Sequence, residues 1–119
     1  METFCYNGHD SRKHYYLGQL TAVLRLLYGA MYALEYGGSE GRSYVDAGIA
    51  SSRVILSGMY AEASHQDLVA VLEDGLQQLA TVATGLSDAT VTNDEVTKAL
   101  AWFIKIVIKI GKVTITIEF

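Results

Sequence analysis

The stretch from Phe103 to Phe119 constrains the fold most, because large β-branched residues alternate along it on both sides of Gly111-Lys112. Glycine at the first position of a two-residue loop fits a tight hairpin turn, since it adopts positive φ without steric cost. With that turn, all the residues that face one another on one side of the two strands are apolar. They are Ile104, Ile106, Ile108, Ile110, Val113, Ile115, Ile117 and Phe119.

This alternation predicts a C-terminal two-stranded β-hairpin over residues 103–119. Ile and Val side chains are stiff and favour strands, and a slip of one residue would turn the whole apolar set toward solvent. The alternative is an amphipathic helix, which could lie on a membrane surface. Its polar side would be a basic stripe of Lys98, Lys105, Lys109 and Lys112.

The rest of the chain has helical periodicity, so the expected fold is one α+β domain over residues 1–119. Residues 1–13 are expected to be irregular or to form a short third strand. Residues 14–102 are expected to be helical, and the hairpin follows. Three longer helices and one short helix are expected, at about residues 12–36, 43–63, 65–86 and 93–102, because glycine-rich or polar segments separate these ranges.

The first of these helices carries two rows of side chains. Large apolar residues recur at alternating spacings of three and four, which is typical of a seam in a helical bundle. The seam residues are Leu17, Leu20, Leu24, Leu27, Met31 and Leu34. Tyr28, Tyr32 and Tyr36 form a second row, which is expected either to flank the core or to be a contact surface, since tyrosine is enriched in such surfaces.

Small residues and charges mark the middle of the chain. In the second helix, Ala47, Gly48, Ala50 and Ser51 would let another helix approach closely. Between Arg53 and Lys98 there are seven acidic residues and no Lys or Arg, whereas four lysines follow from Lys98 onward. Either these are solvated surfaces, with lysines that keep the hairpin soluble, or the acidic helix and the basic hairpin meet, within one chain or between copies.

Composition narrows the class of protein. Half of the 119 residues are apolar, which is enough for a core, and the single cysteine, Cys5, excludes a disulfide bond within the chain. No signal peptide is visible, and Lys105 and Lys109 interrupt the C-terminal apolar run. We therefore expect a cytoplasmic protein without a transmembrane segment. The net charge of −4 argues against a dedicated nucleic-acid-binding protein.

A metal site is one alternative function. Glu62 and His65 match the Glu-x-x-His motif of di-iron helical bundles, and Glu35 on the preceding helix could supply a third ligand. A four-helix metal-binding protein would use these three residues. Against it, Ser64 resembles a helix start, which would break the spacing of the motif. No other cofactor is expected.

Two further classes of protein follow from the sequence as alternatives. A small helical subunit of a nucleoprotein complex would contact RNA or DNA through basic side chains, with Arg12, Lys13, Arg25, Arg42 and Arg53 as candidates. An enzyme is not favoured, because no Gly-x-Ser-x-Gly nucleophile motif is present.

The sequence therefore favours a small structural or assembly protein, which is a subunit of a homo-oligomer or of a larger complex. Contacts are expected through helix packing and β-strand addition, because apolar residues are in surplus and the hairpin has open edges. The expected contact residues are Tyr28, Tyr32, Tyr36, Val113, Ile115, Ile117 and Phe119.

Overall fold

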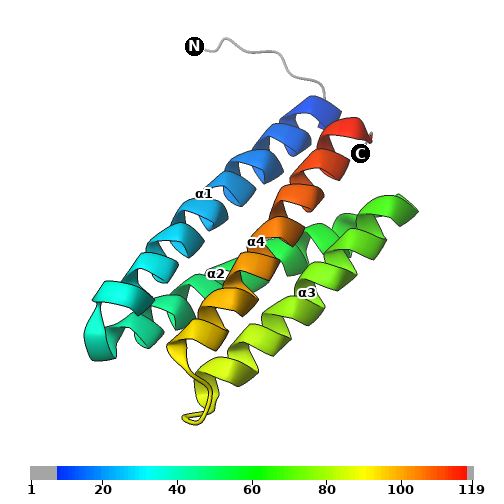
Figure 1. Cartoon of the computed structure of the whole chain (residues 1–119). Helices are drawn as coiled ribbons and strands as arrows, with labels where there is room; N and C mark the ends of the chain where they lie inside the picture. The colour runs from blue at the N-terminus through cyan, green and yellow to red at the C-terminus, as the bar shows by residue number, and fades with distance from the viewer. Residues whose placement is uncertain (1–7, 118–119) are drawn as a thin grey trace, which may run out of the picture.

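The structure is a computed structural model that describes the backbone of residues 8–117 and the side chains of residues 12–117. Its long helices are α1 (Gly8–Tyr36), α2 (Gly41–Glu62), α3 (Gln66–Ser87) and α4 (Asn93–Thr116), with the 3-10 helix η1 (Gly38–Glu40) between the first two. Each long helix packs against two others, α1 and α3 both on α2 and α4. Helix α4 lies between α1 and α3 at the front of Figure 1, and α2 crosses behind them. The fold is a four-helix bundle.

The α+β expectation is wrong at the C-terminal end. The described residues contain no strand, and the segment expected to form a hairpin continues the helix α4 to Thr116. Gly111 lies inside this helix and makes no turn. The short strand considered for residues 1–13 would fall on residues 1–7, which lie outside the described part of the chain, because α1 already begins at Gly8.

Burial along α4 follows the helical period instead of alternation. The buried residues recur every three or four positions: Val96, Leu100, Phe103, Ile104, Val107, Ile110 and Thr114. Val107, which the hairpin would place on its polar side, is 1% exposed, whereas Ile115, which the hairpin would bury, is 61% exposed. The preference of Ile and Val for strands is small and depends on context. A helix pairs its own backbone groups and buries this stripe against the other helices, whereas an isolated hairpin would leave both edges unpaired.

The alternative interpretation of this segment, an amphipathic basic helix, matches the structure. Lys98, Lys105, Lys109 and Lys112 are all exposed along the outward side of α4, and we call them the α4 lysine row. On the inward side the hydroxyl of buried Thr114 donates a hydrogen bond of 2.7 Å to the Ile110 carbonyl oxygen, so this polar group is satisfied inside the core.

The first predicted seam is half correct. Leu20, Leu27 and Leu34 are buried in the bundle core, whereas the other predicted members are only partly buried. The buried row is completed instead by Tyr16, Val23 and Ala30. Both rows share every second residue, because alternating spacings of three and four fit two neighbouring stripes of a helix.

The turn between α1 and α2 requires glycine at two positions. A Cβ atom at Gly37 or at Gly41 would lie 2.5 Å from the carbonyl oxygen of Ala33, so neither position has room for a side chain. Gly38, between them, has a φ of +62°, which glycine adopts without strain. The turn therefore brings the end of α1 and the start of α2 into close contact.

The helical burial pattern of α4 gives a prediction that a hairpin would reverse. Val107→Lys should destabilise the fold by more than about 3 kcal/mol, because it places an unpaired charge in the core. Ile108→Lys should change stability by less than about 1 kcal/mol, because Ile108 is 39% exposed. Urea unfolding followed by circular dichroism measures both, and the opposite ranking would contradict a helical α4.

Candidate interaction surfaces

The residues considered for a metal site are not brought together. Glu62, at the end of α2, accepts a hydrogen bond from the Tyr16 hydroxyl and so lies near the start of α1. Glu35 is near the other end of α1, about 29 Å further along at ~1.5 Å per residue. His65 caps α3 by accepting the Asp67 backbone N–H at 3.2 Å. No group of three or more His, Cys, Asp or Glu residues in the described part of the chain could hold a metal ion.

Arg42, a candidate for nucleic-acid contact, is occupied within the fold. Its Nε donates to Asn93 Oδ1 at 3.0 Å, and its Nη1 donates to the carbonyl oxygens of Gly85 at 3.5 Å and Asp88 at 3.3 Å. Its Nη2 donates to the carbonyl oxygen of Val91. These bonds fasten the start of α2 to the end of α3 and the start of α4.

The other basic candidates lie on two different helices. Arg12, Lys13 and Arg25 lie on α1, where Lys13 Nζ donates to the Ile115 carbonyl oxygen at 3.4 Å. Arg53 is exposed on α2. With Arg42 bound to the α3–α4 loop, the five residues do not form one basic surface.

The tyrosine row of α1 is an exposed surface. Tyr28, Tyr32 and Tyr36 are 56%, 67% and 66% exposed, and the ring centroids of the last two lie 4.6 Å apart. Glu35 accepts a hydrogen bond from the Tyr36 hydroxyl and thereby raises the pKa of that tyrosine. A hollow of about 460 Å³ beside Tyr28 and Tyr32 separates the row from the start of α4. The row is more exposed than a flank of the core would be.

The other predicted contact residues no longer share an edge. Val113 is partly buried against the core, and Ile117 is 7% exposed. Ile115 faces solvent, and Phe119 lies outside the described residues. Strand addition at these positions is therefore wrong, because α4 has no strand edge to offer.

The side of α2 that faces away from the bundle carries a row of small residues, which we call the α2 outer row. Its members are Ser43, Ala47, Ala50, Val54, Ser57 and Ala61, all exposed. They recur at spacings of four and three, and Val54 is 73% exposed. The sequence signalled part of this surface through Ala47 and Ala50, whereas Gly48 of the same patch faces inward and is buried.

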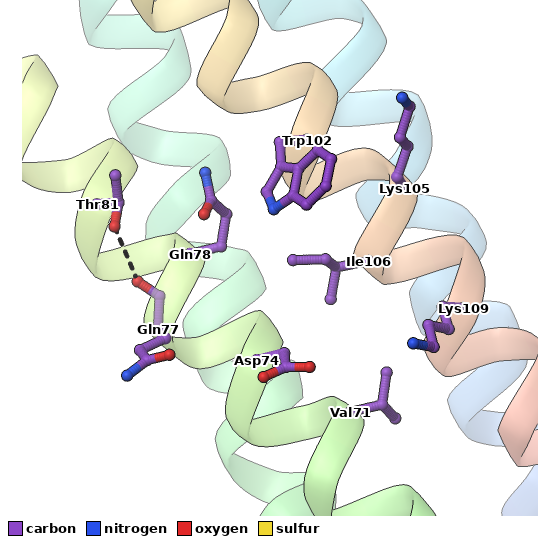
Figure 2. Close-up of a pocket in the computed structure, with 9 residues that line it drawn as sticks. All are labelled: Val71, Asp74, Gln77, Gln78, Thr81, Trp102, Lys105, Ile106 and Lys109. Carbon is purple, nitrogen blue, oxygen red and sulfur yellow. Dashed lines mark hydrogen bonds between the residues drawn. The ribbon is translucent and has the colours of Figure 1, made fainter.

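A groove of about 480 Å³ runs between α3 and α4 (Figure 2). Trp102, 57% exposed, lies at one end, and Lys105 Nζ is 5.7 Å from the centroid of its ring system. Asp74 on α3 and Lys109 on α4 both line this groove. The acidic helix and the basic segment thus meet within one chain, although no ion pair within 4.0 Å joins α3 and α4 among the described side chains.

Charge is separated between helices in the folded molecule. From Arg12 to Leu34 in α1 and from Val96 to Ile117 at the end of the described chain there is no acidic residue. These two segments hold seven of the nine Lys and Arg residues. Helices α2 and α3 hold five acidic residues against Arg42 and Arg53. Sequence reasoning missed this pattern, because α1 and α4 lie far apart along the chain and become neighbours only in the bundle.

Comparison with known proteins gives no relative. No family model matches the chain, and neither does any curated protein or solved structure. Among the described helices, the segment Arg12–Tyr36 is long and apolar enough to cross a membrane by length and composition, with 28% of its most apolar window buried. A helix in the core of a bundle can meet the same criterion of length and composition.

Removal of the Arg42 side chain should loosen one end of the bundle. We expect Arg42→Ala to lower the free energy of unfolding by about 2–4 kcal/mol, because it leaves carbonyl oxygens of Gly85, Asp88 and Val91 without this donor. Arg25→Ala, which removes an exposed guanidinium on α1, should cost less than about 0.5 kcal/mol. Urea denaturation measures both variants, and equal effects would contradict the structural role of Arg42.

The contact between α1 and α2 should make stability depend on alkaline pH. Burial, with the hydrogen bond and charge of Glu62, raises the pKa of Tyr16 to about 12, from an ordinary value of 10. Because the folded protein keeps the Tyr16 proton that the unfolded chain loses, its contribution is complete below pH 10 and is lost as the pH rises toward 12.

Comparison with Tyr16→Phe isolates this effect from the other tyrosines. In urea unfolding between pH 8 and about pH 11.5, the wild type should lose more stability than Tyr16→Phe, which has no proton to release at this position. Parallel pH profiles of the two proteins would contradict the assignment.

Proposed function

We propose that this protein is a small assembly protein that associates with copies of itself by helix packing, with the α2 outer row as the contact. The observation that carries the proposal is an exposed row of small side chains at heptad spacing, flanked by one acidic and one basic residue that have no partner within the described chain. Strand addition has no part in this mechanism.

The spacing of the α2 outer row is that of a helix–helix seam. Positions 43, 47, 50, 54, 57 and 61 follow the alternation of four and three that defines the apolar seam of a coiled coil. The side chains are small, so a second helix could approach closely and exclude water from Val54. A surface exposed only to solvent does not require this regular spacing.

Charge complementarity indicates how a second copy would lie. Asp46 and Arg53 flank the row on one side, a full heptad apart, which is about 10 Å along the helix and too far for a direct ion pair. In an antiparallel pair with a two-fold axis near Ala50, Asp46 of one copy lies across from Arg53 of the other, and Ala47 lies across from Val54. Because the two-fold axis relates the two copies, each of these contacts occurs twice in the dimer.

The tyrosine row would be a second contact. Tyr28, Tyr32 and Tyr36 lie on α1, and their exposure suits a surface that binds another protein through rigid aromatic side chains. A protein with one two-fold contact stops at a dimer, whereas a second contact extends the dimer into a larger assembly. The α2 contact is therefore the one to test first.

The test is the solution mass by multi-angle light scattering over a range of concentrations. We expect the wild type to be at least dimeric. Val54→Glu should raise the dimer dissociation constant by at least about tenfold, because two copies of the charge would be buried in one interface. Ala70→Glu, which places the same charge at an exposed position of α3, should leave the mass unchanged.

Charge exchange tests the geometry of the pair. Asp46→Arg and Arg53→Asp alone should each weaken association, because each places like charges opposite one another. The double variant restores opposite charges and should recover the wild-type mass. A wild-type monomer at every concentration, or a dimer indifferent to Val54→Glu, would refute the α2 contact, and a monomer would point to a different protein as the partner.

A further inference from the structure

The outward side of α4 combines cations with exposed apolar side chains. The α4 lysine row runs along its centre, from Lys98 to Lys112. Trp102, 57% exposed, lies on the flank that faces α3. Ile108 and Ile115, 39% and 61% exposed, lie roughly a quarter of a turn round the helix from the lysine row, on the flank opposite to Trp102. The burial pattern of α4 therefore leaves large apolar groups in water next to lysines.

No acidic residue interrupts this surface on α4 or on the adjoining part of α1. The acid-free segments run from Val96 to the end of α4 and from Arg12 to Leu34 in α1, which contacts α4. The acidic residues that border it are Asp67 and Asp74 on α3, which line hollows beside Lys109, and Asp94, Glu95 and Glu35 at the end of the bundle where α4 begins. On α4 itself, the only charged side chains from Lys98 to Lys112 are lysines.

We propose that this side of α4 docks the protein on an anionic lipid surface. Lysines near a membrane are attracted by its negative headgroups. Tryptophan is favoured at the boundary between headgroups and acyl chains, and isoleucine gains by leaving water. From Lys98 to Ile115 the outward side of α4 extends over about 26 Å, so the helix would lie flat along the bilayer.

A lipid surface fits these residues better than a nucleic acid. Phosphates would attract the lysines equally, and Trp102 could stack on a base. Two exposed isoleucines, however, have no partner among phosphates and sugars. The shallow apolar layer below lipid headgroups accepts them.

Membrane docking goes beyond self-association and is compatible with it. Helices α4 and α2 lie diagonally across the bundle, because each packs on α1 and α3, and Figure 1 shows α4 at the front and α2 behind; their outward sides therefore face away from each other. A protein bound to lipid through α4 would keep the α2 outer row accessible to another copy.

The experiment is binding of the full chain to vesicles. Trp102 is the only tryptophan, so its emission reports the environment of this surface without a label. We expect the protein to co-sediment with phosphatidylcholine–phosphatidylserine vesicles but not with phosphatidylcholine vesicles, and the emission of Trp102 to shift to shorter wavelength on binding. High salt should release the protein, because the attraction is electrostatic.

Variants with matched charge locate the contact. Lys105→Gln with Lys112→Gln should weaken vesicle binding by about tenfold, because each lysine contributes separately to attraction by the lipid. Ala80→Glu with Thr84→Glu changes the net charge by the same amount on exposed positions of α3 and should reduce binding far less. Ile108→Ser with Ile115→Ser should weaken binding and reduce the shift of the Trp102 emission.

Three results would overturn the proposal. The first is absence of binding to phosphatidylserine vesicles at low salt. The second is binding that high salt does not reverse, which would indicate insertion of α1 instead of docking by α4. The third is salt-dependent binding to single-stranded or duplex DNA without vesicle binding, which would assign the lysine row to a nucleic acid.

Discussion

The inward stripe of α4 is the constraint on which the rest of the bundle depends. Phe103 is the largest fully buried side chain in the described core, and Leu100, Val107 and Ile110 are buried with it. Helix α3 can approach this stripe closely because Gly75 has no side chain: a Cβ atom there would lie 3.2 Å from Ile110 Cδ1 and 3.3 Å from Leu56 Cδ1. Three helices thus meet at one point through a glycine. This contact is part of a core that all four helices share, and burial of apolar area of this kind is the dominant favourable term in folding.

The extent of the first three helices could be predicted from sequence, because their leucines repeat with a period that only a helix satisfies. Residues 103–117 satisfied two periods at once. Alternating isoleucines match a strand, whereas only two of them, Ile104 and Ile110, join Phe103, Val107 and Thr114 in the buried helical stripe. The secondary-structure preferences of the individual residues could not distinguish the strand from the helix. The helix is favoured because α1 and α3, on either side of α4, bury its apolar stripe. The alternative prediction for this segment, an amphipathic helix with a basic stripe of lysines, is the one that the structure confirms.

The candidate surfaces were predictable only where they lie within one helix. The tyrosine row and two members of the α2 outer row follow from spacing along a single segment. The role of Arg42 does not, because its acceptors belong to the end of α3 and the following loop. The same holds for Glu35 and Glu62, because Glu35 lies near the end of α1, whereas Glu62 ends α2 and contacts Tyr16 near the start of α1. A site that is built from two or more segments can be identified only once the bundle places those segments next to one another.

The separation of charge between helices has a consequence for how the molecule moves as well as for what it contacts. Cations on α1 and α4 and carboxylates on α2 and α3 give the bundle a permanent electric dipole directed across its long axis. A charged object therefore exerts a torque on the molecule before touching it, over a range set by the screening length of the solution, about 8–10 Å at physiological ionic strength. The molecule is then oriented before it makes contact. A lower ionic strength therefore increases the fraction of encounters in which the basic side of the bundle meets an anionic partner first.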